Sequence, residues 1–320
     1  MELQFLGTSA GTPTTSRNVT GLALKKANTK SWILVDCGEA TQHRILHTAL
    51  SLRRLQAICI THLHGDHCYG LPGLLASANL MGRTDALTII GPVELQQWLR
   101  VTLQLTHVTL SYPLRFIDVA TLTAAVELDD FKVSALALSH RVPCVGYEFV
   151  ETGLPRKLDK DKLLAANIEP GPVWGQLQRG NTVTLADGRM VDGDDFLLAS
   201  RPPRRVIIAG DNDSPALLTD RIQSAQLLVH EATYTQDIAD QLGAEPQHSS
   251  AQMIAQFAEQ AVLPNLILTH FSSRYQDGGC GHTISDIEQE ARAYYGGTLF
   301  LARDLDVYDL DYSGKLTQRR

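Results

Sequence analysis

The spacing of apolar positions along the chain predicts a mixed α/β protein. In one set of segments apolar and polar residues alternate and β-branched side chains are frequent, which favours strands. In another set apolar residues recur at steps of three and four, which favours amphipathic helices. The expected strands cover residues 2–6, 19–25, 31–36, 55–60, 86–91, 131–138, 145–150, 205–210, 226–230, 265–269 and 297–302. The expected helices cover residues 40–50, 70–81, 92–105, 215–223, 249–261 and 284–295.

The order of these elements predicts the layers of the fold. Two runs of strands, each ending in helices, indicate two sheets packed face to face with helices on the outside. We therefore expect an α/β (α+β) protein, a four-layer αββα sandwich that forms one domain over residues 1–320. A chain of 320 residues that is 44% hydrophobic can bury such a core.

One stretch, residues 151–195, departs from this pattern. It contains Gly153-Leu154-Pro155, Glu169-Pro170-Gly171-Pro172 and Ala186-Asp187-Gly188, and it has too few apolar residues for a core of its own. Within 151–180 there are five basic side chains against four acidic ones, a net charge of +1 in a chain whose net charge is -7. We expect this stretch to project from the domain, either as a disordered surface insertion or as a flexible arm that binds substrate.

The composition of the chain limits which cellular compartment and which binding partners we expect. The first residues lack the basic stretch and long apolar core of a secretory signal, so we expect none, and no apolar run approaches the roughly 18 residues that a membrane span needs. A net charge of -7 argues against the bulk attraction to nucleic acid that basic proteins show, and no DNA partner is expected. We expect a cytoplasmic protein with free thiols, because the cysteines form no C-x-x-C pair. They are Cys37, Cys59, Cys68, Cys144 and Cys280.

A dense group of metal-binding residue types follows the expected strand at 55–60. The sequence Thr61-His-Leu-His-Gly-Asp-His67 places three histidines and an aspartate within six residues. His62 and His64 share one side of an extended chain, so both can bind one metal ion, while Asp66 and His67 lie in the turn that follows and can face a second ion. Imidazole together with carboxylate suits Zn²⁺ better than Mg²⁺ or Ca²⁺.

Two four-coordinate ions that share a ligand need about seven protein groups, so more donors should follow other strands. His140, Asp211 and His270 each come directly after an expected strand. Any one of them alone could equally be structural. Three repetitions of a strand followed by a donor instead favour one shared site at a sheet edge.

Taken together, these residues resemble a known fold and a known family. The H-x-H-x-D-H stretch, followed in order by His140, Asp211 and His270, resembles the metallo-β-lactamase fold, which carries a dinuclear zinc site. Further motifs along the whole chain resemble the ribonuclease Z family of tRNA 3′-processing endonucleases, whose short bacterial form is also called ribonuclease BN. These motifs are Phe5-Leu-Gly-Thr-Ser9, Asp36-Cys-Gly-Glu-Ala-Thr-Gln42, His230-Glu-Ala-Thr233, His248-Ser-Ser250 and Thr269-His-Phe-Ser-Ser-Arg-Tyr275.

The resemblance implies a role for each matched position. Two Zn²⁺ per subunit are expected, for which Mn²⁺ or Co²⁺ can substitute, with a bridging water that attacks phosphorus. Asp66 would orient or deprotonate this water, and His248, held by Glu231, would protonate the leaving 3′ oxygen. Alternatively, His248 could cap the helix expected at 249–261. The implied ligands are His62, His64 and His140 for one ion, Asp66, His67 and His270 for the other, and Asp211 between them.

Substrate contacts are implied in the same way. Residues 13–18 resemble the family's P-x-K-x-R-N loop, which assigns Arg17 and Asn18 to the tRNA 3′ end, with Thr15 where lysine is common. Gly171-Pro172 resembles the Gly-Pro motif of the arm that grips the tRNA. Ala40 stands where the family motif has glycine. Arg274 and Tyr275 would hold a phosphate or only pack. Basic groups expected to position the tRNA backbone include Arg156, Lys157, Arg201, Arg204 and Arg205.

The expected activity is endonucleolytic removal of 3′ trailers from tRNA precursors, leaving a 3′-hydroxyl, with a 3′ exonuclease activity as an addition. The resemblance also implies a homodimer in which the arm of one subunit serves the site of the other. Two alternatives stay open: another dinuclear-zinc hydrolase that acts on a small phosphodiester, thioester or lactone, and a non-catalytic RNA-binding protein.

Overall fold

The computed structural model describes residues 1–154, 156–199, 201–276, 278 and 281–319, so that Pro155 and Cys280 lie outside the described residues. The chain divides into two compact units. The larger unit comprises Met1–Val150 and Arg204–Arg320, and the smaller, inserted unit comprises Glu151–Pro203. The insertion expected over 151–195 thus falls within the smaller unit, which ends later than expected.

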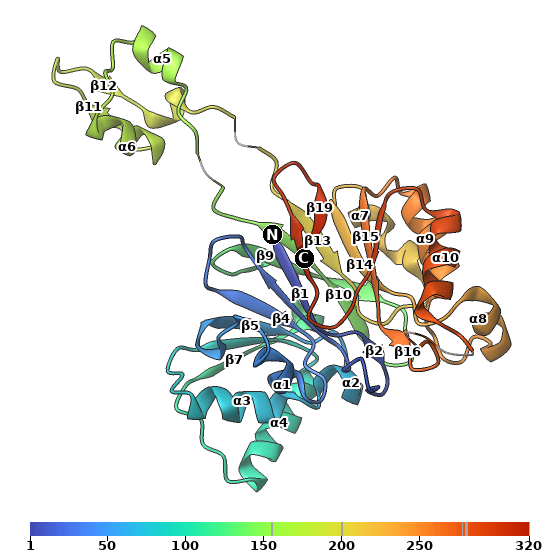
Figure 1. Ribbon diagram of the computed structural model, residues 1–320. Coiled ribbons are helices and arrows are strands. Elements are labelled where there is room, and N and C mark those ends of the chain that lie inside the picture. The colour runs from blue at the N-terminus through green and yellow to red at the C-terminus, as the bar shows by residue number, and fades with distance from the viewer. Residues whose placement is uncertain (155, 200, 277, 279–280, 320) are drawn as a thin grey trace. The chain divides into compact units, whose positions relative to one another are not determined.

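The larger unit is built on two sheets, as the strand pattern predicted (Figure 1). Strands β4 to β7 of the first sheet run parallel, and so do strands β13, β14, β15 and β17 of the second. In spatial order the first sheet contains β19 (Leu316–Arg319), β18 (Val307–Leu310), β1 (Glu2–Gly7), β3 (Gly21–Lys25), β4 (Trp32–Val35), β5 (Leu55–Cys59), β6 (Leu87–Gly91) and β7 (Leu114–Asp118). The second contains β17 (Thr298–Leu301), β15 (Asn265–Thr269), β14 (Leu227–Glu231), β13 (Arg205–Ile208), β10 (Cys144–Glu151), β9 (Phe131–Leu138) and β8 (Val126–Glu127).

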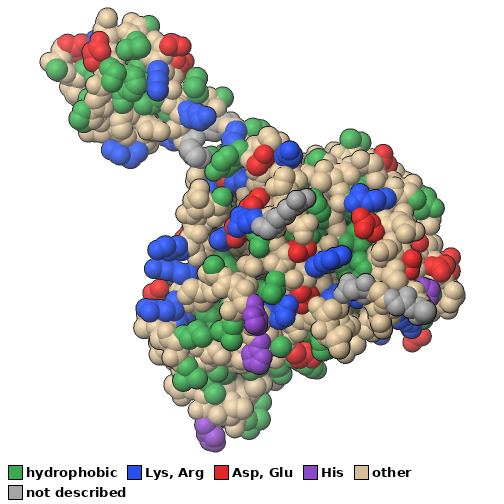
Figure 2. Space-filling model, viewed as in Figure 1, with side chains coloured by type: hydrophobic (Ala, Val, Ile, Leu, Met, Phe, Trp, Pro, Cys, Tyr) green, Lys and Arg blue, Asp and Glu red, His purple; other side chains and the backbone are tan. Residues whose placement is uncertain are grey.

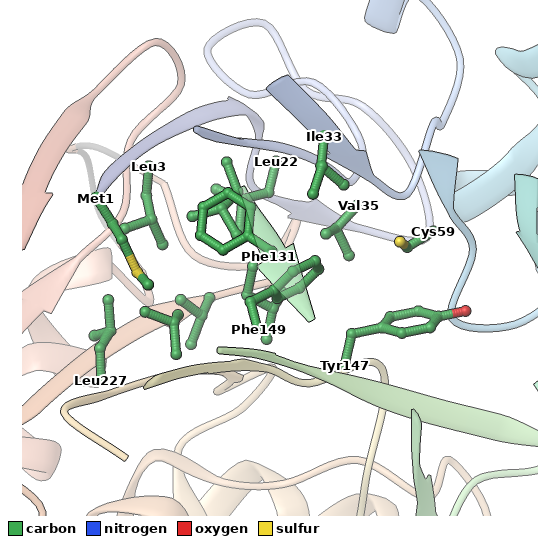
Figure 3. Close-up of a cluster of buried hydrophobic side chains, with 14 of the residues drawn as sticks. Met1, Leu3, Leu22, Ile33, Val35, Cys59, Phe131, Tyr147, Phe149 and Leu227 are labelled. Atoms are coloured by element: carbon green, nitrogen blue, oxygen red, sulfur yellow. The ribbon is translucent and has the colours of Figure 1, made fainter. Parts of the chain in front are cut away.

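A single apolar core joins the inner faces of the two sheets. Leu3, Leu22 and Val35 of the first sheet meet Phe149 and Leu227 of the second in one buried cluster (Figure 3). Because successive side chains of a strand point to opposite faces, the residues between them are free to pack against the outer helices. This arrangement gives each sheet two apolar faces, which explains why the central strands read as nearly continuous apolar runs.

Helices cover the outer face of each sheet, so the predicted four layers are present (Figure 1). None of the described helices combines the length and apolar character needed to cross a bilayer. The helices beside the first sheet include α1 (Thr41–Ile45), η1 (Leu52–Arg54), α2 (Gly65–Cys68), α3 (Leu71–Leu80) and α4 (Val93–Leu105). The short η2 (Val119–Thr121) instead packs Val119 against the core between the sheets. The second sheet has η4 (Pro215–Leu218), α7 (Thr219–Ile222), α8 (Gln236–Leu242), α9 (Ala251–Gln260) and α10 (Ile284–Tyr294).

Every strand predicted from the sequence is present, but several strands were missed. The edge strands β7 and β19 are partly exposed and carry polar residues, so they show no clear apolar run. A short pair, β2 (Ser9–Ala10) with β16 (Phe271–Ser272), joins distant segments and has no local signal. Helix α1 ends at Ile45, earlier than the expected 40–50, because only Thr41 and Ile45 face the core.

The inserted unit has secondary structure and a small core of its own, so the expectation of too few apolar residues for a core was wrong. Its four buried apolar side chains come from widely spaced positions, so no short segment of the sequence is rich in apolar residues. They are Leu163, Ile168, Leu177 and Phe196. The elements are α5 (Lys160–Ala165), α6 (Pro172–Gln178), β11 (Val183–Thr184), β12 (Met190–Val191) and η3 (Gly193–Phe196). On its surface, basic, acidic and apolar side chains are interspersed (Figure 2).

Candidate metal centre

Seven predicted donors come together at one edge of the larger unit. The stretch from His62 to His67 leaves the end of β5 and turns into α2. His140, Asp211 and His270 follow the ends of β9, β13 and β15. Because β13, β14 and β15 run parallel, the loops that follow them share one edge of the sheet. We call this cluster of seven side chains the candidate metal centre.

The first donor group contains His62, His64, His140 and Asp211, whose donor atoms all lie within 4.8 Å of one another. Nδ1 of His64 is 3.1 Å from Nε2 of His62 and 3.2 Å from Nε2 of His140. Oδ2 of Asp211 is 3.6 Å from each of those Nε2 atoms. Three nitrogens and one oxygen around a common point could hold one four-coordinate metal ion.

The second donor group contains Asp66, His67 and His270. The Nε2 atoms of the two histidines are 3.3 Å apart, and Oδ2 of Asp66 lies 3.5 and 3.4 Å from them. Oδ1 of Asp211 is 3.4 Å from both Nε2 atoms. The two oxygens of one buried carboxylate therefore face different donor groups, so this side chain could contact a metal in either group.

Buried carboxylates dominate the electrostatics of the centre. Burial alone would lower the pKa of His67, but Asp211, Asp36 and Asp66 outweigh burial and raise it to about 10. Burial would raise the pKa of Asp66, yet His67 and His270 hold it below its usual range. The pKa of Asp211 is lowered against the effect of burial by the same two histidines. Converging nitrogens and carboxylates of this kind favour a bound cation, so the residues present fit a metal.

The outer nitrogens of two histidines are fixed by a hydrogen-bond network around Asp36. Nδ1 of His67 is 2.7 Å from Oδ2 of Asp36, and Nδ1 of His62 is 3.0 Å from the Thr61 hydroxyl. Asp36 in turn accepts from the backbone N–H of Thr61 at 2.8 Å. Such partners orient the imidazole rings and set which nitrogen faces the metal. Asp36 has a φ of 58°, a left-handed conformation that few residues other than glycine adopt.

The other sheet supplies equivalent partners. Nδ1 of His140 is 2.9 Å from the carbonyl oxygen of Gln247, and Nδ1 of His270 is 3.1 Å from the Thr233 hydroxyl. The Thr233 hydroxyl also lies within hydrogen-bond distance of Oε2 of Glu231 and of the His270 carbonyl oxygen. Each of these four histidines thus presents Nε2 to the centre and Nδ1 to a fixed partner, whereas His64 presents Nδ1.

Two glycines allow the first donor loop to pack closely against the loop after β4. A Cβ on Gly38 would lie 2.3 Å from the Asp66 carbonyl oxygen, and one on Gly70 would lie 2.1 Å from the Gly38 carbonyl oxygen. Backbone bonds from Cys37 N–H to the His67 carbonyl at 2.7 Å and from Gly70 N–H to the Cys37 carbonyl at 2.9 Å hold the two segments together. The motif around Asp36 therefore supports the ligands.

His248 and Glu231 form a pair beside the centre. Nδ1 of His248 is 2.9 Å from Oε2 and 3.0 Å from Oε1 of Glu231. Burial would lower the pKa of His248, but the charge and hydrogen bond of Glu231 and the charge of Asp211 raise it to about 9. The cap of α9 is Ser250, whose hydroxyl accepts from the Met253 N–H, so the alternative role of His248 as a helix cap is wrong.

The N-terminal loop supports the centre more than the sequence suggested. Gly11 N–H donates to Oδ2 of Asp66 at 2.7 Å. Asp304 holds the same loop by accepting from Asn18 N–H at 2.7 Å and from the Thr8 hydroxyl at 2.8 Å. The side-chain amide of Asn18 donates to the Glu39 carbonyl at 2.8 Å. Sequence reasoning missed Gly11 and Asp304, since their partners lie 55 and 286 positions away.

Two predicted substrate contacts require correction. Tyr275 is fully buried, and its hydroxyl bonds to the backbone N–H of Thr235 at 2.8 Å, so the packing alternative holds for it. The guanidinium of Arg17, a side chain that is only 6% exposed, donates to the Tyr275 carbonyl. Both side chains are buried and stabilise the loops that carry them. Arg274 is exposed, with its guanidinium carbon 6.0 Å from the centre of the Tyr234 ring.

Some of the basic groups expected to contact a nucleic acid backbone are also engaged elsewhere. Arg204 is 3% exposed, donates to the Leu310 carbonyl at 2.6 Å and lies over the Tyr312 ring. Arg205 lies 3.3 Å from the buried Glu148. Arg204 therefore stabilises the larger unit, which corrects the expectation for it, whereas the side chain of Arg205 is 34% exposed and its predicted role stays a prediction.

The inserted unit keeps its own predicted residues at its surface. Gly171 and Pro172 are exposed at the start of α6, where Pro172 occupies the first turn. Proline suits that position because its nitrogen needs no hydrogen-bond partner there. A Cβ on Gly171 would meet nothing within 4 Å, so the local packing does not require glycine.

The chain has close relatives among known proteins. It is 53% identical to the ribonuclease Z of Marinobacter nauticus, with 97% of each chain covered. It is 50% identical to that of Pseudomonas putida over 99% of each chain, and 44% identical to the ribonuclease BN of Proteus mirabilis over 86% of this chain and 90% of the relative. The family described as anti-Pycsar protein Apyc1 matches residues 1–142.

Solved structures agree with the sequence comparison. The short form of human tRNase Z superposes with a TM-score of 0.64 and 27% identity, covering 97% of this chain and all of that one. A metallo-β-lactamase fold protein from Bacillus subtilis gives a TM-score of 0.63 at 18% identity, covering 96% and 98% of the two chains, which shows the fold alone. This chain has the metallo-β-lactamase fold and belongs to the ribonuclease Z family.

Proposed function

We propose that this protein is a zinc-dependent phosphodiesterase that cuts the 3′ trailer from tRNA precursors and leaves a 3′-hydroxyl on the tRNA. Membership of the ribonuclease Z family makes it a hydrolytic tRNA endoribonuclease. The observation that carries the mechanism is the position of Asp211, whose two oxygens face two separate donor groups, with the His248–Glu231 pair beside them. An added 3′ exonuclease activity stays a prediction.

In this proposal the two donor groups hold two Zn²⁺ ions. His62, His64 and His140 would bind one ion and Asp66, His67 and His270 the other, with Asp211 between them. Imidazole-rich sites with one or two carboxylates are typical of zinc, and Mn²⁺ or Co²⁺ would fit the same ligands. When bound, such ions lower the pKa of water to near neutrality and stabilise negative charge on a phosphate.

The side chains of the chain then perform the proton transfers. Asp66 is positioned by Gly11 N–H, so one of its oxygens is held while the carboxylate can accept a hydrogen bond from the attacking water. His248 is protonated below a pKa of about 9 and would give its proton to the 3′ oxygen as the phosphorus–oxygen bond breaks. Glu231 fixes the ring and stabilises its charged form.

We propose that the inserted unit contacts the body of the tRNA, away from the bond that is cut. It has its own core and an exposed surface that includes Gly171, Pro172, Lys157 and Lys160. A compact unit of this kind can be recognised by shape and phosphate contacts without a base-specific site.

Two further proposals concern assembly and compartment. We propose a homodimer, which the resemblance to the family implies. Leu80, Val101 and Leu105 of α3 and α4, with exposed fractions of 87%, 41% and 73%, are apolar side chains available for such a contact. We propose the cytoplasm as the compartment, because the described cysteines are buried and free, as in reducing surroundings.

The direct test uses a 3′-extended tRNA precursor made with and without an encoded CCA, labelled at its 5′ end. We expect one zinc-dependent cut close to the 3′ end of the acceptor stem, and mapping of the product end identifies the bond. The CCA substrate shows how the chain, with Thr15 in its N-terminal loop, treats a mature end. Cleavage of small phosphodiesters without any cleavage of precursors would instead support the alternative of a small-molecule hydrolase.

A further inference from the structure

A cavity of about 390 Å³ lies beside His248 and outside the candidate metal centre. Small-molecule sites range from about 300 to 1,000 Å³, so this one admits a single group the size of a nucleobase and part of its sugar. Its lining combines the segment before α9 with α8 and the loop after β13. The lining includes Asp213, Tyr234, Gln236, Asp240, Gln247 and Met253.

One wall of the cavity is tied to the groups that perform the chemistry. The carbonyl oxygen of Gln247 is 2.9 Å from Nδ1 of His140, a metal-binding candidate. The next residue, His248, bonds to Glu231 through Nδ1. Gln247 has a φ of 52°, so the backbone bends at this point. A group bound in the cavity would therefore lie next to both a metal ligand and the proton donor.

The cavity offers a surface on which a flat ring can stack. The Tyr234 ring is half-buried and meets the His248 ring edge to face, with centroids 6.0 Å apart and an interplanar angle of 77°. Leu242 and Met253 add apolar lining. Aromatic side chains of this kind bind nucleobases by stacking, and the free energy depends little on which base is present.

The charges of the cavity favour a base over a phosphate. Asp213 and Asp240 line it, and no lysine or arginine occurs among the described lining residues, although the guanidinium carbon of Arg274 lies 6.0 Å from the centre of the Tyr234 ring outside that lining. A phosphate would be repelled by these carboxylates, while the amino and ring N–H groups of a base could donate to them. Asp240 accepts from the Gln236 amide at 2.7 Å and Asp213 from the Ser214 hydroxyl at 2.8 Å, and each carboxylate has further lone pairs.

We propose that this cavity binds the base of the last nucleotide retained on the tRNA, the one whose 3′ oxygen leaves phosphorus. This inference rests on the proposed function, in which water adds to phosphorus, the bond to the 3′ oxygen breaks, and that oxygen takes a proton from His248. Because His248 also lines the cavity, the nucleotide that carries this oxygen is the one whose base can reach it. The carboxylates favour adenine, guanine or cytosine, which carry amino groups, over uracil.

The test uses three precursors that differ only around the scissile bond. One is intact, one lacks the base on the 5′ side of the cut, and one lacks the base on the 3′ side. For the wild-type protein, loss of the 5′-side base lowers kcat/KM by roughly tenfold or more, the effect of losing one stacked base. Loss of the 3′-side base has a smaller effect.

Variants assign this effect to the cavity. In Tyr234→Ala, removal of the 5′-side base lowers kcat/KM only slightly further, because the stacking partner is already absent. Tyr234→Phe keeps the ring and restores the sensitivity. The matched control is Tyr294→Ala, an exposed tyrosine on α10 outside the cavity, which keeps the wild-type sensitivity. A combined Asp213→Ala and Asp240→Ala variant reduces the preference for cytosine over uracil at this position.

The outcomes separate this inference from the proposed function. Failure of the wild-type protein to cut the intact precursor overturns both. If the wild-type protein cuts the intact precursor normally, three results would overturn the cavity assignment alone. The first is a larger fall in kcat/KM on loss of the 3′-side base, and the second is no fall on loss of either base. The third is an equal fall in kcat/KM for Tyr234→Ala and the wild type when the 5′-side base is removed.

Discussion

The candidate metal centre and the inserted unit Glu151–Pro203 differ in what holds them together. In the centre, polar groups contact one another, because the imidazoles face carboxylates and most of these side chains are buried. The outer nitrogens of His67, His62 and His140 bond to Asp36, Thr61 and Gln247. The inserted unit depends instead on four buried apolar side chains and exposes most of its polar groups. Damage to the centre should therefore affect every substrate, whereas damage to the inserted unit should affect only tRNA.

The largest expected effect concerns Asp211. Asp211→Ala removes the oxygens that face both donor groups and leaves four buried histidines with fewer negative partners. We expect kcat to fall at least ~10³-fold for precursor tRNA and for bis(p-nitrophenyl) phosphate, because metal binding supplies several kcal/mol of transition-state stabilisation. Steady-state rates and bound metal are the measurements. A variant that keeps the wild-type rate and the wild-type metal content would contradict the role of Asp211 as a shared ligand.

Removal of the inserted unit should separate the two substrates. Val150 and Arg205 face each other on β10 and β13, so residues 151–203 can be replaced by Asn-Gly, which together with Arg204 closes a three-residue turn. We expect kcat/KM for precursor tRNA to fall at least ~10²-fold through lost remote binding, with the rate on bis(p-nitrophenyl) phosphate and the metal content retained. Equal loss on both substrates would show that the unit supports the centre itself.

A pH profile should identify the proton donor. His248 is protonated below its pKa of about 9, so kcat for precursor should fall as pH rises through that value. Glu231→Gln removes the charge that raises this pKa, so the same fall should begin at lower pH, and kcat near neutrality should drop by roughly 10²-fold. Glu288→Gln, on the exposed surface of α10, serves as the control. An unshifted alkaline limb in Glu231→Gln would exclude this role of the pair.

A mutation in the small core should weaken the inserted unit alone. Leu177→Ala removes one of its four buried apolar side chains and should cost the unit about 2–5 kcal/mol of stability. Hydrogen exchange within residues 160–196 should rise, while exchange in β14 and β15 stays the same. Leu164→Ala, at a side chain that is 48% exposed, is the matched control and should have little effect. Slower exchange in the variant, or faster exchange in both units, would contradict the independence of the two cores.

The smallest expected effect is at Ala40, which has a φ of 58° at the start of α1. A left-handed conformation costs alanine roughly 1–2 kcal/mol, whereas glycine adopts it freely but loses more entropy on folding. Ala40→Gly should therefore raise the free energy of unfolding by up to about 1 kcal/mol without a change in kcat. Chemical denaturation measures this change, and a destabilised variant would show that the alanine methyl group makes a favourable contact.

The candidate ligand residues were predictable because the sequence around each one carries a local signal. His62 to His67 form a dense motif, and His140, Asp211 and His270 each end an apolar strand, a pattern that sheet topology turns into proximity. Their supporting partners were not predictable in this way. The backbone N–H of Gly11 donates to the Asp66 carboxylate, and the Asp304 carboxylate accepts from the backbone N–H of Asn18, so each contact joins residues far apart in the chain.

Elsewhere, local reasoning failed for a different reason. Composition alone suggested that the inserted unit had no core, because Leu163, Ile168, Leu177 and Phe196 are separated by polar residues and meet only after folding. Arg204 has the same charge as any phosphate-binding arginine, and only its burial reveals a structural role. Sequence shows which chemistry a residue can perform, whereas burial and partners decide whether it is available for that chemistry.

Metal analysis of the purified protein combined with turnover in chelator tests the central claim most directly. If seven side chains hold two ions that precursor cleavage requires, elemental analysis should find two transition-metal ions per chain. Prolonged chelation should then abolish cleavage, and added Zn²⁺ should restore it. Folded, metal-free protein that cuts precursor tRNA at the full rate in chelator would contradict the account.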